Sequence, residues 1–450
     1  MKTIYPRSVK HIRVSEPAEE QGCHEQSSHE PHPNFNERHP NSTEQHPNFN
    51  ERHPDFIEQH PNFNERHPDS TERHPEFNEG REGTRHSLKP STGSGARIYP
   101  KGRGAQSDIP NPFEKNRYVD WEIDLPKDQS ERKTQYIEVF PKSIVNKVES
   151  PDVPSDYSIN PYQGCEHGCI YCYARNSHTF WGYNMGLDFE SRILYKSNAP
   201  ELLEKKLQSK NWVANPIMLS GNTDPYQPLE YKLKITRKLL EVFLEYKHPV
   251  SIITKNSMIL RDLDILKELN KHRLVSVAVS ITTLNEKLRQ VLEPKTASGH
   301  ARIRTVKALA ANHIPVSVMM APIIPSLNSQ EIIPLVKAAA EAGARNVQPI
   351  IARLNGQLLD IFEDWAYLNF PERAKKILKQ IAEAHGGQAN DSRFGKRMRG
   401  EGQFVEHIHQ QFKLARRLYL KPHEKFEHNC SSFTGQSSHQ LSLFTERQIA

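Results

Sequence analysis

The sequence lacks any long hydrophobic run, which argues against a membrane-spanning helix. Its longest apolar stretches, residues 275–281 and 316–324, are far shorter than the roughly 20 residues needed to cross a bilayer. Residues 1–13 contain no apolar segment of the kind that a secretory signal peptide carries. We therefore expect a soluble, cytoplasmic protein with no membrane partner.

Hydrophobic residues are also scarce, at 36% of the chain, below the roughly 45–50% of globular domains. Part of the reason is a heptapeptide repeat in which His-Pro recurs every seven residues from His32 to His74. A proline in every repeat excludes a coiled coil, and one phenylalanine per repeat cannot form a core. We expect a disordered arm over residues 1–95, followed by a linker and lead-in segment over 96–150. The repeated histidines are either metal ligands or a tolerated repeat expansion.

Cysteine is rare and unevenly placed. The chain has five cysteines, and three of them, Cys165, Cys169 and Cys172, lie within eight residues. An odd number in this arrangement is not a disulfide framework and indicates metal chemistry in a reducing compartment.

Residues 151–355 alternate short β-branched runs with helical patterns, which is typical of repeated βα units. The expected strands are residues 158–162, 216–220, 250–254, 274–281, 316–321 and 346–351. The expected helices are residues 199–208, 233–246, 260–270, 300–312 and 329–342. The pattern predicts an α/β fold, a partial (βα)6 barrel of the TIM type, whose functional loops follow the carboxyl ends of its strands. A helical extension over 356–420 and a flexible tail over 421–450 complete the chain.

The three cysteines form a C-x3-C-x2-C motif after the first barrel strand. Thiolates at this spacing bind three irons of a [4Fe-4S] cluster and leave the fourth iron open to a small molecule. Gly164 and Gly168 allow a tight loop around such a cluster. The alternatives are coincidence and a structural zinc site with His167 as its fourth ligand.

Several segments together resemble the radical S-adenosylmethionine (SAM) superfamily, and in particular the bacterial proteins related to spore photoproduct lyase. The resemblance runs from about residue 136 to residue 420. It is carried by residues 101–105, 160–175, 219–228, 252–256, 279–283, 362–365 and 391–400.

This resemblance implies a [4Fe-4S] cluster and SAM as cofactors. The reduced cluster would split SAM into methionine and a 5′-deoxyadenosyl radical, which takes hydrogen from a substrate. An electron donor of the flavodoxin or ferredoxin type is implied as partner. The lyase-like reaction of the group is an expectation here, and its substrate is unidentified.

The resemblance also implies which residues contact SAM. Tyr171 corresponds to the residue that packs beside the adenine, or it is ordinary loop packing. The loop after the second strand corresponds to the segment that meets the methionine amino group, although Asp224 could instead cap this loop. Lys255 corresponds to a partner of the SAM carboxylate, or is a solvated lysine. Ser280 corresponds to a ribose contact, with Thr282 and Thr283 as substitutes. The full expected set is Tyr171, Ser220, Gly221, Asn222, Asp224, Lys255 and Ser280, beside the metal ligands Cys165, Cys169 and Cys172.

Other residues are weaker candidates. Ile323 and Ile324 either wall the adenine or belong to the core. The charged candidates for the substrate side, each more simply a surface charge or salt-bridge partner, are Asp188, Glu190, Arg302 and Arg304.

The substrate is the open question. Homologues of spore photoproduct lyase carry a hydrogen-donating cysteine near the second strand, but residues 217–224 contain none, so photoproduct repair is not expected. The remaining thiols are Cys23 and Cys430, of which Cys430 could act as donor. A nucleic-acid substrate is one candidate, with phosphate contacts from the basic run 396–399, Arg416, Arg417 and Lys421; a peptide or small molecule is the other. The alternative function is a non-catalytic iron–sulfur protein for electron transfer or sensing.

Overall fold

The structure is a computed structural model that describes residues 102–109, 111–113 and 133–435. The predicted arm over residues 1–95, with its histidine repeat and Cys23, lies outside the described residues. No helix within the described part has the length and apolar character needed to cross a membrane.

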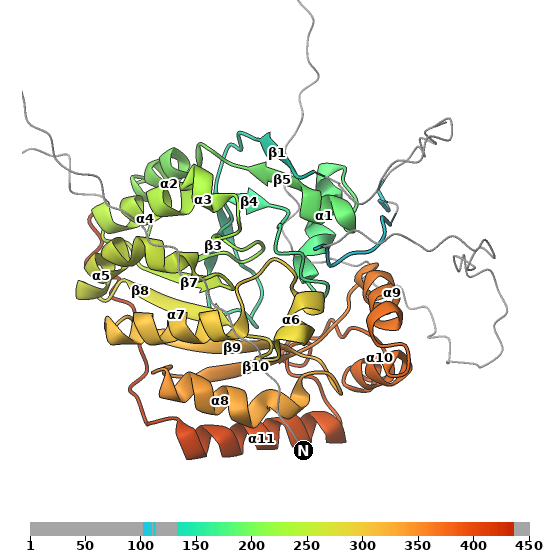
Figure 1. Cartoon of the computed structure of the whole chain (residues 1–450). Coiled ribbons are helices and arrows are strands. Elements are labelled where there is room, and N and C mark those ends of the chain that lie inside the picture. Colours follow the sequence, from blue (N-terminus) through green and yellow to red (C-terminus); the bar gives the residue numbers. More distant parts are fainter. Residues whose placement is uncertain (1–101, 110, 114–132, 436–450) are drawn as a thin grey trace, which may run out of the picture. The chain divides into compact units, whose positions relative to one another are not determined.

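A seven-stranded sheet forms the centre of the described chain, in the order β10-β9-β8-β7-β6-β3-β2 (Figure 1). Neighbouring strands are parallel throughout, except that β2 runs antiparallel to β3. The strands are β2 (Val145–Lys147), β3 (Tyr157–Ile159), β6 (Ile217–Leu219), β7 (Val250–Thr254), β8 (Val275–Ser280), β9 (Val316–Ile323) and β10 (Val347–Ile351). The predicted α/β architecture with a parallel sheet is therefore confirmed, whereas closure of the sheet into a barrel stays a prediction.

Helices follow the strands, most of them near the predicted ranges, but the helix over residues 286–292 was not predicted. They are α2 (Ala199–Leu207), α3 (Glu230–Leu233), α4 (Ile235–Glu245), α5 (Leu263–Lys271), α6 (Glu286–Leu292), α7 (Gly299–Ala311) and α8 (Ile332–Glu341), with short 3-10 turns η3 (Ser257–Asp262) and η4 (Ser329–Glu331). Along β7 and β8, fully buried residues alternate with half-buried ones. Because successive strand side chains point to opposite faces, one face of the sheet is packed into the core and the other is less completely covered.

A second, smaller sheet lies beside the first and carries part of the candidate site. Its order is β1-β5-β4, with strands β1 (Gln135–Glu138), β4 (Tyr162–Gln163) and β5 (Arg192–Tyr195). The turn η2 (Tyr173–Trp181) and helix α1 (Leu187–Ser191) connect β4 to β5. The sequence patterns did not predict this sheet, because its strands are only two to four residues long.

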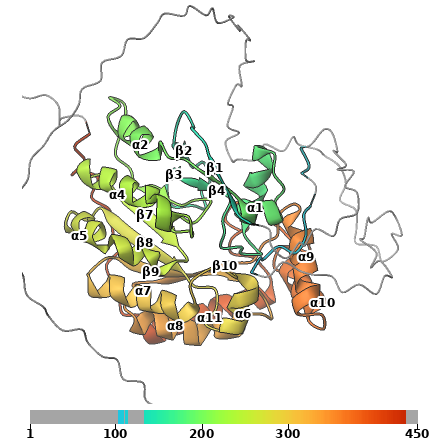
Figure 2. The same cartoon turned by 45° about the horizontal axis from the view of Figure 1, so that its top comes forward.

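The carboxyl-terminal part contains α9 (Leu358–Asn369), α10 (Ala374–Glu383) and α11 (Gln403–Tyr419). Helix α11 lies beside α8 (Figures 1 and 2), and the Arg416 side chain on α11 also donates to the carbonyl of Val347 in the edge strand β10. The segment between α10 and α11 joins the two edges of the large sheet. Met398 accepts a 3.0 Å hydrogen bond from the amide of Ile351 in β10, and Arg397 forms a 2.6 Å ion pair with Asp152 in the β2–β3 loop.

Candidate functional site

The three cysteines lie in one tight, buried loop between β4 and η2. Cys165 and Cys169 are each 7% exposed, and Cys172 is half-buried. Gly164 and Gly168 adopt φ values of 76° and 66°, a region that side-chain-bearing residues rarely enter. A Cβ on Gly164 would lie 2.8 Å from the carbonyl oxygen of Arg192. The glycines predicted to fold this loop are therefore needed for its conformation.

A segment that precedes the sheet holds the outer side of this loop. The amide nitrogens of Gly104 and Ala105 donate to the carboxylate of Glu190, at 2.9 and 2.7 Å. The same carboxylate is paired with Arg175, and both side chains are fully buried. A Cβ on Gly104 would lie 1.8 Å from the carbonyl oxygen of Gly168, so only glycine permits this approach. Glu190 therefore stabilises the cysteine loop by binding the segment that contains Gly104 and Ala105, and it is not a substrate contact.

The electrostatic surroundings of the cysteines suit a positively charged metal cluster. Burial raises the pKa of the Cys165 thiol, and the negative charges of Asp224 and the neighbouring cysteines raise it further. Burial likewise raises the pKa of Cys169. Buried thiols of this kind become thiolates when a metal binds, because the metal supplies the missing positive charge. The donor set therefore fits an iron–sulfur cluster.

The zinc alternative depends on where the His167 ring points. No group of three His, Cys, Asp or Glu side chains in residues 102–109, 111–113 and 133–435 is arranged to hold one ion. His167, which the zinc alternative needs as a fourth ligand, turns instead toward the ends of two strands. Its Nδ1 lies 3.5 Å from Asp224 Oδ2, and its Nε2 lies 3.4 Å from Asn256 Nδ2. Burial lowers the pKa of His167 although Asp224 opposes this, so the ring is a neutral spacer between the loop and the sheet.

Asp224 connects the carboxyl ends of β6 and β7. Its carboxylate accepts hydrogen bonds from the amide of Lys255 at 2.7 Å and from the hydroxyl of Thr254 at 2.8 Å. It also accepts a 2.9 Å bond from the amide of Tyr226, which is the capping arrangement that the sequence offered as an alternative. Asp224 therefore caps its own loop and fixes the backbone beneath the Lys255 side chain.

The rest of the β6 loop is held by its own polar groups. Asn222 donates to Gln163 at 3.1 Å and to Ser177 at 2.9 Å, and Ser220 donates to the carbonyl of Thr223. Ser220 has a φ of 83°, an uncommon value for a residue with a side chain. The carbonyl of Gly221 accepts a hydrogen bond from the Tyr173 hydroxyl. The predicted residues thus come together beside the cysteine loop, with their side chains largely engaged in shaping it.

Tyr171 and Lys255 face each other next to the cysteines. The Lys255 ammonium lies 5.9 Å from the centre of the Tyr171 ring, within the range of a cation–π contact. Burial alone would lower the pKa of Lys255, but the charges of Cys169 and Glu293 outweigh it, so the net pKa is raised. Lys255 is therefore a charged group directed at the loop and not a freely solvated lysine.

The Tyr171 hydroxyl is anchored by a buried network. It donates to the carboxylate of Glu293 and lies 3.0 Å from the Thr282 hydroxyl. Glu293 is in turn ion-paired with Arg302, and both side chains are fully buried. Arg302 also donates to the carbonyl of Ser280 at 2.9 Å. Burial opposes the charge of Glu293, but Arg302 and Lys255 lower its pKa to about 2.

The structure also shows the surroundings of the weaker candidates for the substrate side and the adenine wall. Arg302 and Glu190 are salt-bridge partners, as one alternative held, but they lie in the interior and not on the surface. Asp188 is buried and accepts a 2.7 Å hydrogen bond from Asn184, whereas Arg304 is exposed on α7. Ile323 and Ile324 are both fully buried in the hydrophobic core.

Cys430 lies at the opposite end of the sheet from the cysteine loop. Its neighbour Asn429 donates to the carbonyl of Arg273, just before β8, and Thr434 donates to the carbonyl of Tyr246, ahead of β7. The cysteine loop contacts residues that follow these strands. The expectation that Cys430 could donate hydrogen at the site is therefore wrong in this structure.

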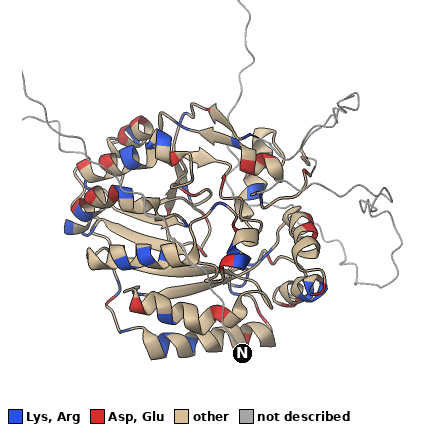
Figure 3. Cartoon of the chain, in the orientation of Figure 1, with Lys and Arg blue, Asp and Glu red and all other residues tan. Residues whose placement is uncertain are grey.

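Three of the six basic residues proposed for phosphate contacts, Lys396, Arg397 and Arg416, are engaged by other groups. Lys396 pairs with Glu401 at 2.8 Å, and Arg397 pairs with Asp152. Arg416 donates to the carbonyl of Val347 at the amino end of β10, away from the cysteine loop. Figure 3 shows acidic and basic residues interspersed along the helices, as on α4 and α5. A phosphate-binding surface that includes Arg399, Arg417 and Lys421 stays a prediction.

Three residues near the site were missed at the sequence level. Glu293 anchors Tyr171 from a position 122 residues away, which no local pattern reveals. Tyr173 follows Cys172 directly and is 47% exposed, and the charge of Arg353 acts on it. The position of Tyr173 directly after the third cysteine was the sequence signal that could have identified it.

The chain is similar to a known protein family, to curated proteins and to solved structures. Residues 159–339 match the family model described as the radical SAM superfamily. An uncharacterized protein of Mycobacterium tuberculosis is 32% identical over 238 residues, covering 52% of this chain and 70% of that protein. An uncharacterized protein of Methanocaldococcus jannaschii is 31% identical over 201 residues, covering 45% and 72%. Among solved structures, spore photoproduct lyase complexed with dinucleoside spore photoproduct shows 14% identity and a TM-score of 0.48, covering 63% of this chain and 79% of that one.

Proposed function

Because the chain belongs to the radical SAM superfamily, we propose that it is an enzyme that cleaves SAM reductively and takes a hydrogen atom from a substrate. The observation that carries this proposal is that three thiols, two buried and one half-buried, lie close to the Lys255 ammonium and the Tyr171 ring, beyond the carboxyl ends of β6 to β8. When bound, a [4Fe-4S] cluster supplies the electron that splits SAM into methionine and the 5′-deoxyadenosyl radical.

In this proposal Cys165, Cys169 and Cys172 bind three irons of the cluster. Gly164 and Gly168 let the loop close around it, and Gly104 and Glu190 support the loop from outside. The buried environment keeps water away from the cluster, which protects reactive intermediates.

Lys255 and the β6 loop bind the amino-acid end of SAM. The Lys255 ammonium pairs with the SAM carboxylate, and Asp224 positions Lys255 by holding its backbone amide. Backbone groups between Ser220 and Asp224 receive the SAM amino group, since the side chains there are engaged in the loop itself.

Tyr171 and the end of β8 bind the adenosyl end. The Tyr171 ring packs beside the adenine, and Ser280, with Thr282 as neighbour, contacts the ribose. The hydroxyl of Tyr171 is fixed by Glu293 and Thr282, so the ring is held in one orientation. Preorganised contacts of this kind aim the radical at one substrate atom.

The substrate lies next to Tyr173, the exposed aromatic residue beside Cys172, with the charge of Arg353 close by. An aromatic ring near a cation suits an aromatic or anionic substrate, and a nucleic acid is one such candidate. A donor of the flavodoxin or ferredoxin type would supply the electron that reduces the cluster. The cytoplasmic location is part of the same proposal.

The decisive experiment is anaerobic reconstitution of the full chain with iron and sulfide, followed by dithionite and SAM. Wild-type protein should release 5′-deoxyadenosine, and the Cys169→Ala variant should release none. Cys430→Ala is the matched control, because this thiol lies at the other end of the sheet, and it should behave as wild type. Release of no 5′-deoxyadenosine by protein with an intact cluster would favour the alternative, an iron–sulfur protein for electron transfer or sensing.

The substrate class is tested separately. Deuterated pools of DNA, RNA and protein are offered in turn to the reduced enzyme with SAM. Deuterium that appears in 5′-deoxyadenosine with one pool identifies the substrate class. If neither DNA nor RNA gives enrichment, nucleic acids are excluded as substrates.

A further inference from the structure

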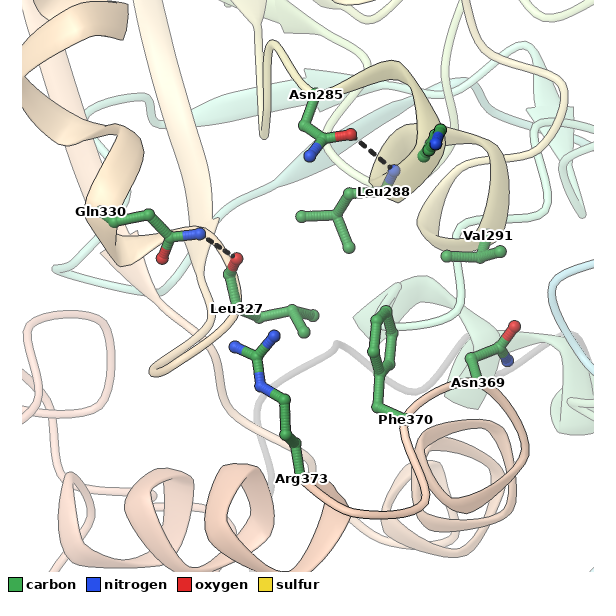
Figure 4. Close-up of a pocket in the computed structure, with 9 residues that line it drawn as sticks. Asn285, Leu288, Val291, Leu327, Gln330, Asn369, Phe370 and Arg373 are labelled. Atoms are coloured by element: carbon green, nitrogen blue, oxygen red, sulfur yellow. Dashed lines mark hydrogen bonds between the residues drawn. The ribbon is translucent and has the colours of Figure 1, made fainter.

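A pocket of about 260 Å³ opens between α6, the loop after β9 and the turn that joins α9 to α10 (Figure 4). Its volume is near the lower end of the roughly 300–1,000 Å³ range of small-molecule sites. It therefore has room for a small ligand or for one end of a longer one.

The pocket carries positive charge without a matching carboxylate. Lys287 from α6 and Arg373 from the α9–α10 turn both line it, and no Asp or Glu is among its lining residues. Two carboxylates lie next to lining residues: Glu286 is ion-paired with Arg289 at 2.7 Å, and Glu331 accepts hydrogen bonds from the Thr283 hydroxyl and the amides of Leu284 and Asn285. Within the described part of the chain, neither Lys287 nor Arg373 forms an ion pair. Arg373 donates to the carbonyl of Ser326, which uses one of its five N–H groups.

The rest of the lining suits a flat, partly apolar group. The Phe370 ring projects into the space between Leu327 and Val291 in Figure 4, and Leu288 faces it from α6. The Phe370 ring is steadied by Trp365, whose ring centre lies 5.5 Å away. An aromatic face of this kind stacks well on a planar ring.

Carboxamides complete the rim. Gln330 donates to the carbonyl of Leu327 at 2.8 Å, and Asn285 accepts from the amide of Leu288 at 3.2 Å. Each amide group therefore keeps polar atoms for a ligand. Cations for an anion, a ring for stacking and amides for a polar edge are the contacts that a nucleotide uses.

We propose that this pocket binds a nucleotide, with its phosphate between Lys287 and Arg373 and its base against Phe370. The site is separate from the proposed SAM site, and helix α6 connects it to the cysteine loop. Helix α6 lines the pocket through Val291, and its last residue, Leu292, accepts a 3.1 Å hydrogen bond from the amide of Ile170 in the cysteine loop. The nucleotide is either free in solution or the end of a single strand, and both present the same chemistry.

The test is a calorimetric titration of the full chain under anaerobic conditions. Excess SAM is present, so that the probe cannot bind at the proposed SAM site. Cytidine 5′-monophosphate is the probe, and cytidine is its uncharged counterpart. We expect cytidine to bind at least about tenfold more weakly, because it lacks the charge-assisted hydrogen bonds to the phosphate. Lys287→Ala and Arg373→Ala should each weaken binding of the monophosphate by about tenfold or more. Lys375→Ala, on the exposed side of α10, should leave it unchanged.

A ten-nucleotide oligocytidylate distinguishes the sources. Tighter binding of the oligonucleotide than of the monophosphate, lost in the same two variants, identifies a strand; the reverse identifies a free nucleotide. Equal binding of cytidine and its monophosphate, no binding of either probe, or wild-type affinity in both variants would overturn the proposal. Because both side chains are exposed, the variants should keep the wild-type melting temperature and the release of 5′-deoxyadenosine, so this outcome is independent of the proposed SAM cleavage.

Discussion

The carboxylate of Asp224, in the loop after β6, accepts a 2.7 Å hydrogen bond from the backbone amide of Lys255 at the end of β7. Two adjacent strands are thereby tied together at the point where the proposed ligand binds. The contact makes the position of the Lys255 ammonium depend on a residue 31 positions earlier in the sequence.

Loss of this tie should weaken SAM binding. Asp224→Ala removes the acceptor for the Lys255 amide and for the Thr254 hydroxyl, so we expect the dissociation constant for SAM to rise by about tenfold. Equilibrium dialysis of the anaerobic, unreduced protein measures it. Asp264→Ala removes an exposed carboxylate that only pairs with Arg237, and it should leave the constant unchanged. Equal constants in wild type and Asp224→Ala would contradict the positioning role.

The Glu293–Arg302 pair should matter more for stability than the Tyr171 hydroxyl that it anchors. Glu293→Gln leaves the buried Arg302 guanidinium without its counter-charge, which costs about 3–5 kcal/mol. Tyr171→Phe removes one hydrogen bond and should cost about 1–2 kcal/mol. Thermal melts should therefore show a clearly larger loss in melting temperature for Glu293→Gln. Joint replacement, Glu293→Met with Arg302→Leu, should recover part of the loss, and equal melting temperatures for the two single variants would refute this ranking.

Gly104 should be required for the cysteine loop to take up iron. In Gly104→Ala the new methyl group meets the carbonyl of Gly168, and overpacking of this kind costs about 1–3 kcal/mol. We expect less iron per chain after reconstitution and a lower melting temperature. Ser107→Ala, three residues along the same segment, is the control and should load iron as wild type does. Full iron content in Gly104→Ala would show that the segment does not support the loop.

Stability should fall on mild acidification because of buried histidines. Burial lowers the pKa of His248 from 6.5 to about 4, and its Nε2 accepts a 3.1 Å hydrogen bond from the Trp212 indole. The unfolded chain binds this proton near pH 6.5 and the folded chain only near pH 4, so stability is full above 6.5 and is lost between 6.5 and 4. The loss is on the order of 2–3 kcal/mol.

Denaturant unfolding between pH 7.5 and 4.5 measures this effect. His248→Gln keeps an acceptor for the indole and should flatten the profile, whereas His272→Gln, at an exposed position, should not. The same slope in wild type and His248→Gln would place the pH dependence elsewhere. His178, whose pKa burial lowers to about 3, then becomes the group to replace.

Strands with strong local patterns were predictable from the sequence, and contacts between distant segments were not. Residues 250–254 were predicted as a strand with the bounds of β7, because a β-branched run there is bounded by a proline and a polar turn. The helix predicted over 233–246 corresponds to α4, which begins only at Ile235, because Lys234 with its φ of 54° separates it from α3. No propensity marks a left-handed lysine, since tertiary packing imposes that conformation.

The candidate site shows the same division. Motif spacing singled out the three cysteines, whereas Asp224 and Lys255 were expected near them because of the resemblance to the radical SAM superfamily. Glu293 and Gly104 were not assigned roles, because their contacts with Tyr171 and Gly168 depend on the packed structure. The reach of Cys430 was misjudged for the same reason, since only the path of the chain after α11 shows which end of the sheet it meets.

The proposed function depends most on SAM binding directly to a cluster held by Cys165, Cys169 and Cys172. Electron paramagnetic resonance of the dithionite-reduced, anaerobic full chain, recorded before and after SAM is added, tests this directly. We expect the spectrum of a reduced [4Fe-4S] cluster, which should change when SAM is added and should be absent in Cys169→Ala. A spectrum that SAM leaves unchanged, or protein that carries zinc in place of iron, would contradict the proposed function.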